Sequence, residues 1–82
     1  MNNLGRNSVL EFAGVMQKKL DENSHKGGWE GCDNSYLFKR LNQEIKEMKT
    51  AIKKNKNRHM VIRECADIAN FAMMIADNYE QQ

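Results

Sequence analysis

Residues 61–78 read VIRECADIANFAMMIADN, and this stretch decides the fold that the sequence predicts. Apolar and small side chains cover most of the circumference of the helix that it would form. A helix that is apolar nearly all round is buried on nearly all sides. Two short helices elsewhere in the chain cannot surround it, so we expect this helix to pack against a second copy of the chain.

Two further segments show helical periodicity, because their apolar residues recur three and four positions apart. The sequence contains no proline, which allows uninterrupted helices. We therefore predict an all-α fold, in which a three-helix chain completes a four-helix bundle by dimerisation. The expected helices cover about residues 8–23, 35–54 and 58–79, with a glycine-rich loop at 24–34.

Polar residues mark the expected helix starts. Ser8 and Glu11 have the spacing of a capping box, and Asn57 is suited to cap the third helix. The second helix has three candidate caps, Asp33, Asn34 and Ser35. Gly14 costs the first helix up to ~1 kcal/mol relative to alanine, which indicates close packing at that position.

The length of 82 residues predicts one globular domain, residues 1–82. A lone domain of this size buries only about 60% of its unfolded surface, which makes its core marginal. Cys32 and Cys65 cannot form a disulfide scaffold. A metal ion and an oligomer remain as sources of stability, so we expect the chain to form an oligomer.

The charge balance and hydropathy exclude several partners. With 13 basic and 11 acidic residues the net charge is +2, and no aromatic residue interrupts the basic run at 53–58, so nucleic acid is not expected. No apolar run approaches the ~20 residues of a membrane-spanning helix. The N-terminal residues MNNLGRNS do not resemble a signal peptide, and we expect a cytoplasmic protein.

Four acidic residues flank the apolar stripes of the second and third helices. Glu64 falls within the stripe of the third helix with Asp67 beside it, and Glu44 and Glu47 have the same spacing on the second helix. Clustered carboxylates repel one another, and a divalent cation relieves that repulsion. Mg²⁺ prefers oxygen ligands and is often shared with substrate phosphates. The pattern therefore favours a magnesium site and a phosphate-bearing substrate.

Two other interpretations of these carboxylates stay open. Glu44 and Glu47 are also typical of a solvated helix face. Glu64 and Asp67 could instead be a buried acidic pair neutralised by a basic side chain. The candidates for that role are Arg63, Arg40 and Lys39.

The order Glu44-x-x-Glu47 and then Glu64-x-x-Asp67 resembles the signature of the MazG-like, all-α nucleoside triphosphate pyrophosphohydrolases. Residues 25–48, HKGGWEGCDNSYLFKRLNQEIKEM, and residues 64–78, ECADIANFAMMIADN, resemble a short, often phage- or prophage-encoded branch of that family. This branch combines a K-x-G-W loop with two acidic helices. The resemblance covers about residues 12–78.

The resemblance implies an enzyme that converts an NTP or dNTP to the monophosphate and pyrophosphate. It implies Mg²⁺, with Mn²⁺ as a substitute, held by the four acidic residues, and a dimer or a tetramer of dimers. The family often has a further glutamate where this chain has Gln43, which leaves the number of metal ions open. Two alternatives are a non-catalytic helical oligomer that sequesters or senses a nucleotide, and a purely structural helical oligomer.

Within this interpretation, four residues receive roles. Glu47 is the candidate general base, because it lies furthest from the apolar stripe. The Trp29 ring could stack on the nucleobase of the substrate, or it could anchor its own loop against the core. Lys26 could reach phosphates, or be solvated. Asn70 could hydrogen-bond the sugar or base, or bind a helix backbone across an interface.

Overall fold

The structure, a computed structural model, describes residues 6–81. Within this range its regular secondary structure is all helical, with no strand, so the predicted all-α class is confirmed. A short 3₁₀ helix lies inside the segment expected to be a loop. The elements are α1 (Ser8–Glu22), η1 (Ser24–Lys26), α2 (Asn34–Lys53) and α3 (Arg58–Glu80).

Asparagine and aspartate side chains cap the three long helices. Asn57 Oδ1 accepts from Met60 N at 2.9 Å, which confirms the predicted cap of α3. Asp33, one of three candidates, caps α2. At α1, Asn7 is the cap.

The predicted capping box at the start of α1 is wrong. Ser8 is the first helical residue and not the cap. Glu11 binds the Arg6 guanidinium at 2.7 Å instead of reaching back to a cap amide. The ion pair with Arg6 therefore occupies the Glu11 carboxylate, which a capping box would need at the helix start.

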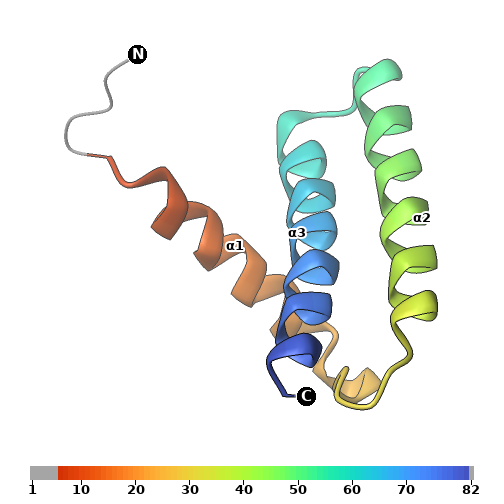
Figure 1. Ribbon diagram of the computed structural model, residues 1–82. Coiled ribbons are helices and arrows are strands. Elements are labelled where there is room, and N and C mark those ends of the chain that lie inside the picture. Colours follow the sequence, from red (N-terminus) through yellow and green to blue (C-terminus); the bar gives the residue numbers. More distant parts are fainter. Residues whose placement is uncertain (1–5, 82) are drawn as a thin grey trace.

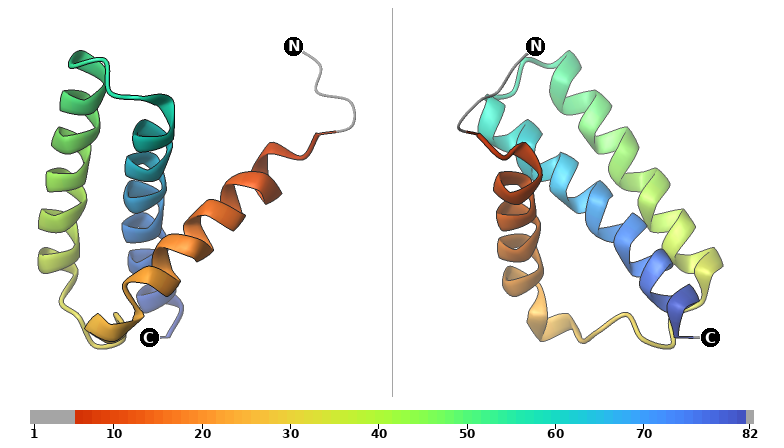
Figure 2. Two further views of the ribbon diagram at one scale, coloured as in Figure 1. Left: turned by 180° about the vertical axis from the view of Figure 1, so that it is seen from behind. Right: turned by 60° about the vertical axis from the view of Figure 1, so that its left-hand side comes forward.

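Helix α3 is central to the arrangement. It runs antiparallel to α2 and beside it, while α1 crosses α3 and diverges from it toward the N-terminal end (Figures 1 and 2). Among the described residues, no Cα atom of α1 lies within 8 Å of one in α2. The two outer helices are therefore joined only through α3 and through the connection that contains η1.

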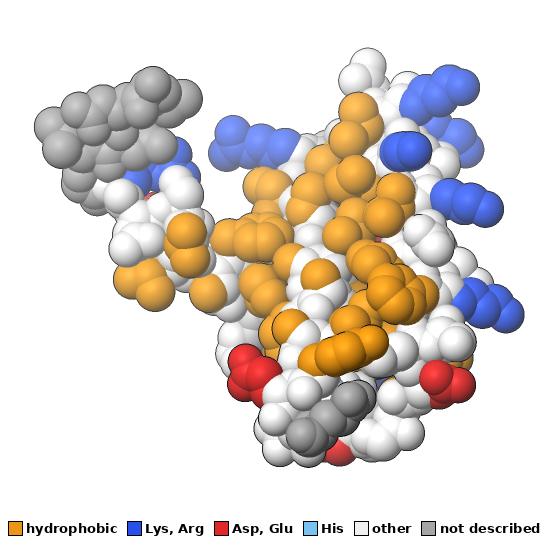
Figure 3. Space-filling model, in the orientation of Figure 1, with side chains coloured by type: hydrophobic (Ala, Val, Ile, Leu, Met, Phe, Trp, Pro, Cys, Tyr) orange, Lys and Arg blue, Asp and Glu red, His pale blue; other side chains and the backbone are white. Residues whose placement is uncertain are grey.

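The buried apolar core of the described chain is small. It consists of Leu37, Ala51 and Ala66, which are 1%, 8% and 0% exposed. Apolar side chains gather instead on the face seen in Figure 3, over α3 and the adjoining sides of α1 and α2. Ile62 of α3 is 41% exposed, so one chain does not bury α3 on nearly all sides. Within residues 6–81, no helix combines the length and apolarity needed to cross a membrane.

The space around Gly14 gives a testable consequence. A Cβ atom built there meets no atom within 4 Å, so the close packing expected at this position is absent from the described chain. We expect Gly14→Ala to stabilise the protein by up to about 1 kcal/mol, because alanine is the better helix former. In a domain of this size the melting temperature should rise by roughly 4–8 °C per kcal/mol, measurable by circular dichroism.

Gly31→Ala is the matched control. Gly31 has φ +83°, a left-handed conformation that alanine adopts only with strain, and we expect the melting temperature to fall. If Gly14→Ala instead lowers stability, the added methyl group must meet other atoms. That result would place this part of α1 against another chain.

Candidate metal centre

A cleft of about 790 Å³ lies where α1 and α2 diverge over α3. All three helices and the connection between α1 and α2 line it. Its wall includes acidic residues from α2 and α3 and aromatic residues that could face a flat ligand. Among the residues that line it are Lys19, Lys26, Trp29, Tyr36, Arg40, Glu44, Glu47, Glu64, Asp67, Asn70 and Phe71.

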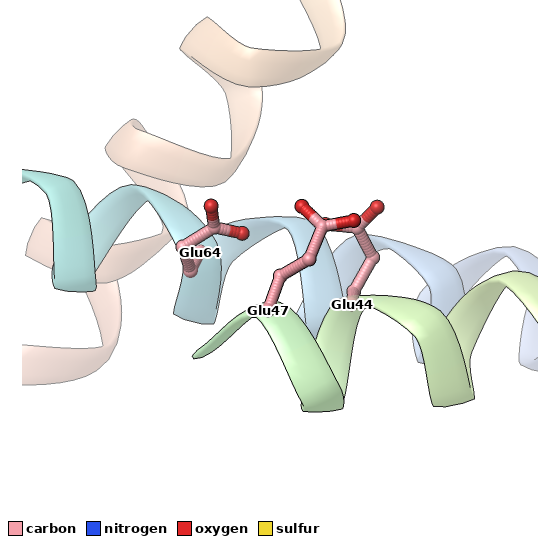
Figure 4. Close-up of side chains that lie close together, drawn as sticks. All are labelled: Glu44, Glu47 and Glu64. Carbon is pink, nitrogen blue, oxygen red and sulfur yellow. The ribbon is translucent and has the colours of Figure 1, made fainter. Parts of the chain in front are cut away.

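Three of the four predicted carboxylates converge. Glu44, Glu47 and Glu64 each offer one oxygen atom, and these atoms all lie within 4.8 Å of one another. Figure 4 shows the carboxyl groups of Glu44 and Glu47 pointing the same way from α2, with Glu64 beside them on α3. Glu44 is buried and Glu47 is exposed. A cluster of this kind could hold a metal ion.

One carboxylate oxygen of Glu64 lacks a partner in the described part of the chain. Its Oε2 atom is buried and has no hydrogen-bond partner among the described residues. Burial raises the pKa of Glu64, and the negative charges of Glu47, Glu44 and Asp67 raise it further. A divalent cation would supply the positive charge and the ligand contact that this oxygen lacks, so the donor set fits a hard metal ion.

Arg40 neutralises part of the cluster. Its guanidinium donates to Glu44 Oε2 at 2.9 Å and also contacts Gln43. The guanidinium carbon lies 5.1 Å from the centre of the Phe71 ring, which places it in a cation–π contact. Arg40 precedes Glu44 by four residues on one helix, so this pair could have been identified from the sequence.

Asp67 lies beside the cluster and is not part of it. Its Oδ2 atom is 3.5 Å from Lys19 Nζ, which α1 provides. Burial raises the pKa of Asp67, although the charge of Lys19 opposes that shift. Arg63 binds Glu22 of α1 instead. The basic candidates predicted from the sequence, Arg63, Arg40 and Lys39, lie on α2 and α3, whereas the partner of Asp67 in the structure comes from α1.

The remaining predicted residues also line the cleft. Trp29 donates from Nε1 to Asp77 Oδ2 at 2.9 Å, and its carbonyl oxygen accepts from Asn78 Nδ2 at 3.2 Å. These two bonds anchor the loop to the C-terminal end of α3. Lys26 lies in η1 on the same wall.

The side-chain amide of Asn70 has a hydrogen-bond partner for its nitrogen atom but, among the described residues, none for its oxygen atom. Its Nδ2 atom donates to the Met16 carbonyl oxygen of α1 at 3.0 Å, so Asn70 binds a helix backbone across the contact between α1 and α3 of one chain. The side chain is 3% exposed, and its Oδ1 atom has no hydrogen-bond partner in the described part of the chain. Asn70 therefore joins α1 to α3 and keeps one buried acceptor without a partner among the described residues.

Lys19, Tyr36 and Phe71 line the cleft without having been singled out from the sequence. Tyr36 and Phe71 carried no local signal that separates them from ordinary helical aromatics. Lys19 reaches Asp67 only because α1 crosses α3, a contact that helical periodicity does not encode.

Comparison of the chain with protein-family models, with curated proteins and with solved structures finds no match. The resemblance to the MazG-like enzymes therefore rests on the motifs of the sequence.

Proposed function

We propose that this protein is a Mg²⁺-dependent nucleotide pyrophosphohydrolase that converts an NTP or dNTP to the monophosphate and pyrophosphate. The observation that carries the proposal is the convergence of Glu44, Glu47 and Glu64 within one large cleft. The buried, unpartnered Oε2 atom of Glu64 supports a cation at this place. A cation bound there would attract the phosphate groups of a nucleotide into the same cleft.

The proposed roles of the four carboxylates differ with their exposure. Mg²⁺, when bound, would neutralise charge that develops on the phosphate oxygens. Glu44, Glu64 and Asp67 are proposed to hold it together with Glu47. Glu47 is the exposed member, so it can also accept a proton from water as the water oxygen attacks the α-phosphorus. The bond from that phosphorus to the bridging oxygen then breaks, and pyrophosphate leaves.

The aromatic part of the cleft lining is suited to the nucleoside. Trp29, Tyr36 and Phe71 offer aromatic surface for a base, and Trp29 is held in place by Asp77. Asn70, whose buried Oδ1 atom has no partner among the described residues, is proposed to accept a hydrogen bond from the sugar or base. Lys26 of η1 also lines the cleft and is proposed to bind phosphate oxygens.

A second copy of the chain is part of the proposal. The exposed apolar side chains of the described residues include Val9, Leu10, Phe38, Ile52 and Ile62. Burying such surface is favourable by about 25 cal/mol per Å². A homodimer or homotetramer that covers the apolar face would complete the four-helix bundle.

The proposal is tested by measuring pyrophosphate release from each common NTP and dNTP with Mg²⁺ and with Mn²⁺. We expect release from at least one nucleotide and none after chelation of the metal. Absence of release from every nucleotide with both metals would contradict the enzyme. Gln43, at a position where the family often has glutamate, favours the alternative of a non-catalytic nucleotide-binding oligomer. That alternative predicts tight binding and recovery of intact nucleotide after long incubation.

A further inference from the structure

We propose that Lys19 competes with the divalent ion for Asp67, so that the ion acquires its fourth carboxylate only when Lys19 releases it. The inference rests on the proposed function, because it takes the cluster of Glu44, Glu47 and Glu64 as the metal site. It assigns to α1 a direct influence on metal affinity.

The contact between Lys19 and Asp67 is sheltered. Lys19 Nζ lies 3.5 Å from Asp67 Oδ2, and the two side chains are 14% and 22% exposed. Charges at such positions are screened less by water and salt than charges on an open surface. The ammonium group therefore holds Asp67 more firmly than an exposed lysine would.

The same contact explains why Asp67 is outside the cluster of close oxygens. Asp67 lines the cleft with Glu44, Glu47 and Glu64, but its carboxylate is not among the three that converge within 4.8 Å. An ammonium group and a divalent ion repel each other. The contact with Lys19 therefore weakens binding of the ion through Asp67, and release of Lys19 strengthens it.

Lys19 has a second partner available without any movement of α1. Its Nζ atom lies 3.9 Å from Glu22 Oε1, one turn further along the same helix. Glu22 is held in place by Arg63, whose two terminal nitrogens donate to it at 2.7 and 3.1 Å. A rotation of the lysine side chain can thus exchange Asp67 for Glu22.

The test is a double-mutant cycle on Mn²⁺ affinity, measured with the metal alone by calorimetry or electron paramagnetic resonance. Methionine at position 19 keeps the length and the apolar stem of lysine. We expect Lys19→Met to bind Mn²⁺ more tightly than wild type by on the order of tenfold. In an Asp67→Asn background the same substitution should gain less than about twofold.

Two controls separate competition from the general loss of a positive charge and from misfolding. Lys18→Met makes the same change in net charge at an exposed neighbouring position and should change affinity by less than about twofold. Lys19→Arg keeps the charge and should bind Mn²⁺ as wild type does, and circular dichroism checks that each variant is folded.

Each result decides the inference. Equal gains in the wild-type and Asp67→Asn backgrounds, or no gain in Lys19→Met, would overturn it while leaving the enzyme proposal intact if wild type still releases pyrophosphate. Mn²⁺ binding by Lys19→Met but not by wild type would support it. If none of the variants binds Mn²⁺, the metal site itself fails and the inference fails with it.

Discussion

Glu64→Gln is expected to abolish the stabilisation of this protein by Mg²⁺ or Mn²⁺ and to lower any pyrophosphate release by about 10²-fold or more. Wild type should gain about 2.7 kcal/mol at a free ion concentration of roughly 100 times the Kd. Glutamine keeps the shape of the side chain and removes the charge that the ion requires. Thermal melts with and without Mn²⁺ measure the difference.

The same substitution should raise the melting temperature of the metal-free protein at neutral pH. The pKa of Glu64 is raised in the folded state by burial and by its acidic neighbours. As pH rises above the ordinary value of 4.5, the unfolded chain loses this proton first, so folded-state stability falls across the window up to the raised pKa. Wild type without metal should therefore lose stability from weakly acidic to neutral pH, and Glu64→Gln should lose less.

Glu80→Gln is the matched control, because Glu80 is an exposed glutamate on the same helix. It should leave the Mn²⁺ effect and the pH dependence as in wild type. The metal assignment would be refuted by a Glu64→Gln protein that Mn²⁺ stabilises as strongly as it does wild type.

Leu37→Ala is expected to destabilise the protein by about 2–5 kcal/mol. Leu37 is 1% exposed, and it is the largest fully buried side chain among the described residues. Small domains are stable by only about 5–15 kcal/mol in total, so this loss should lower the urea midpoint drastically or prevent folding. The loss is a large share of the total stability, because few other apolar side chains are buried among the described residues.

Phe38→Ala provides the comparison for Leu37→Ala. Phe38 is the next residue on α2 and is 51% exposed, so its truncation should cost much less within one chain. Equal losses in the two variants at high protein concentration, shrinking for Phe38→Ala on dilution, would place Phe38 against a second copy. A stable, cooperative Leu37→Ala protein would contradict the small core described above.

Much of the fold could be predicted because it depends on neighbours along the chain. Periodicity placed the three helices within one residue of their observed ends, and Asn57 was identified as a cap from its position alone. The same spacing identified Glu44, Glu47 and Glu64, since α2 and α3 lie side by side and present them together. The capping box failed because Arg6, outside the motif, binds Glu11.

The sequence by itself determined which residues lie on which face of each helix, because the turn of an α-helix is fixed by local backbone hydrogen bonds. Only the tertiary structure decided that α1 diverges from α2, that Lys19 reaches Asp67, and that Trp29 binds Asp77. These contacts depend on the angle at which helices cross. That angle results from the packing of many side chains at once, and no single spacing along the chain encodes it.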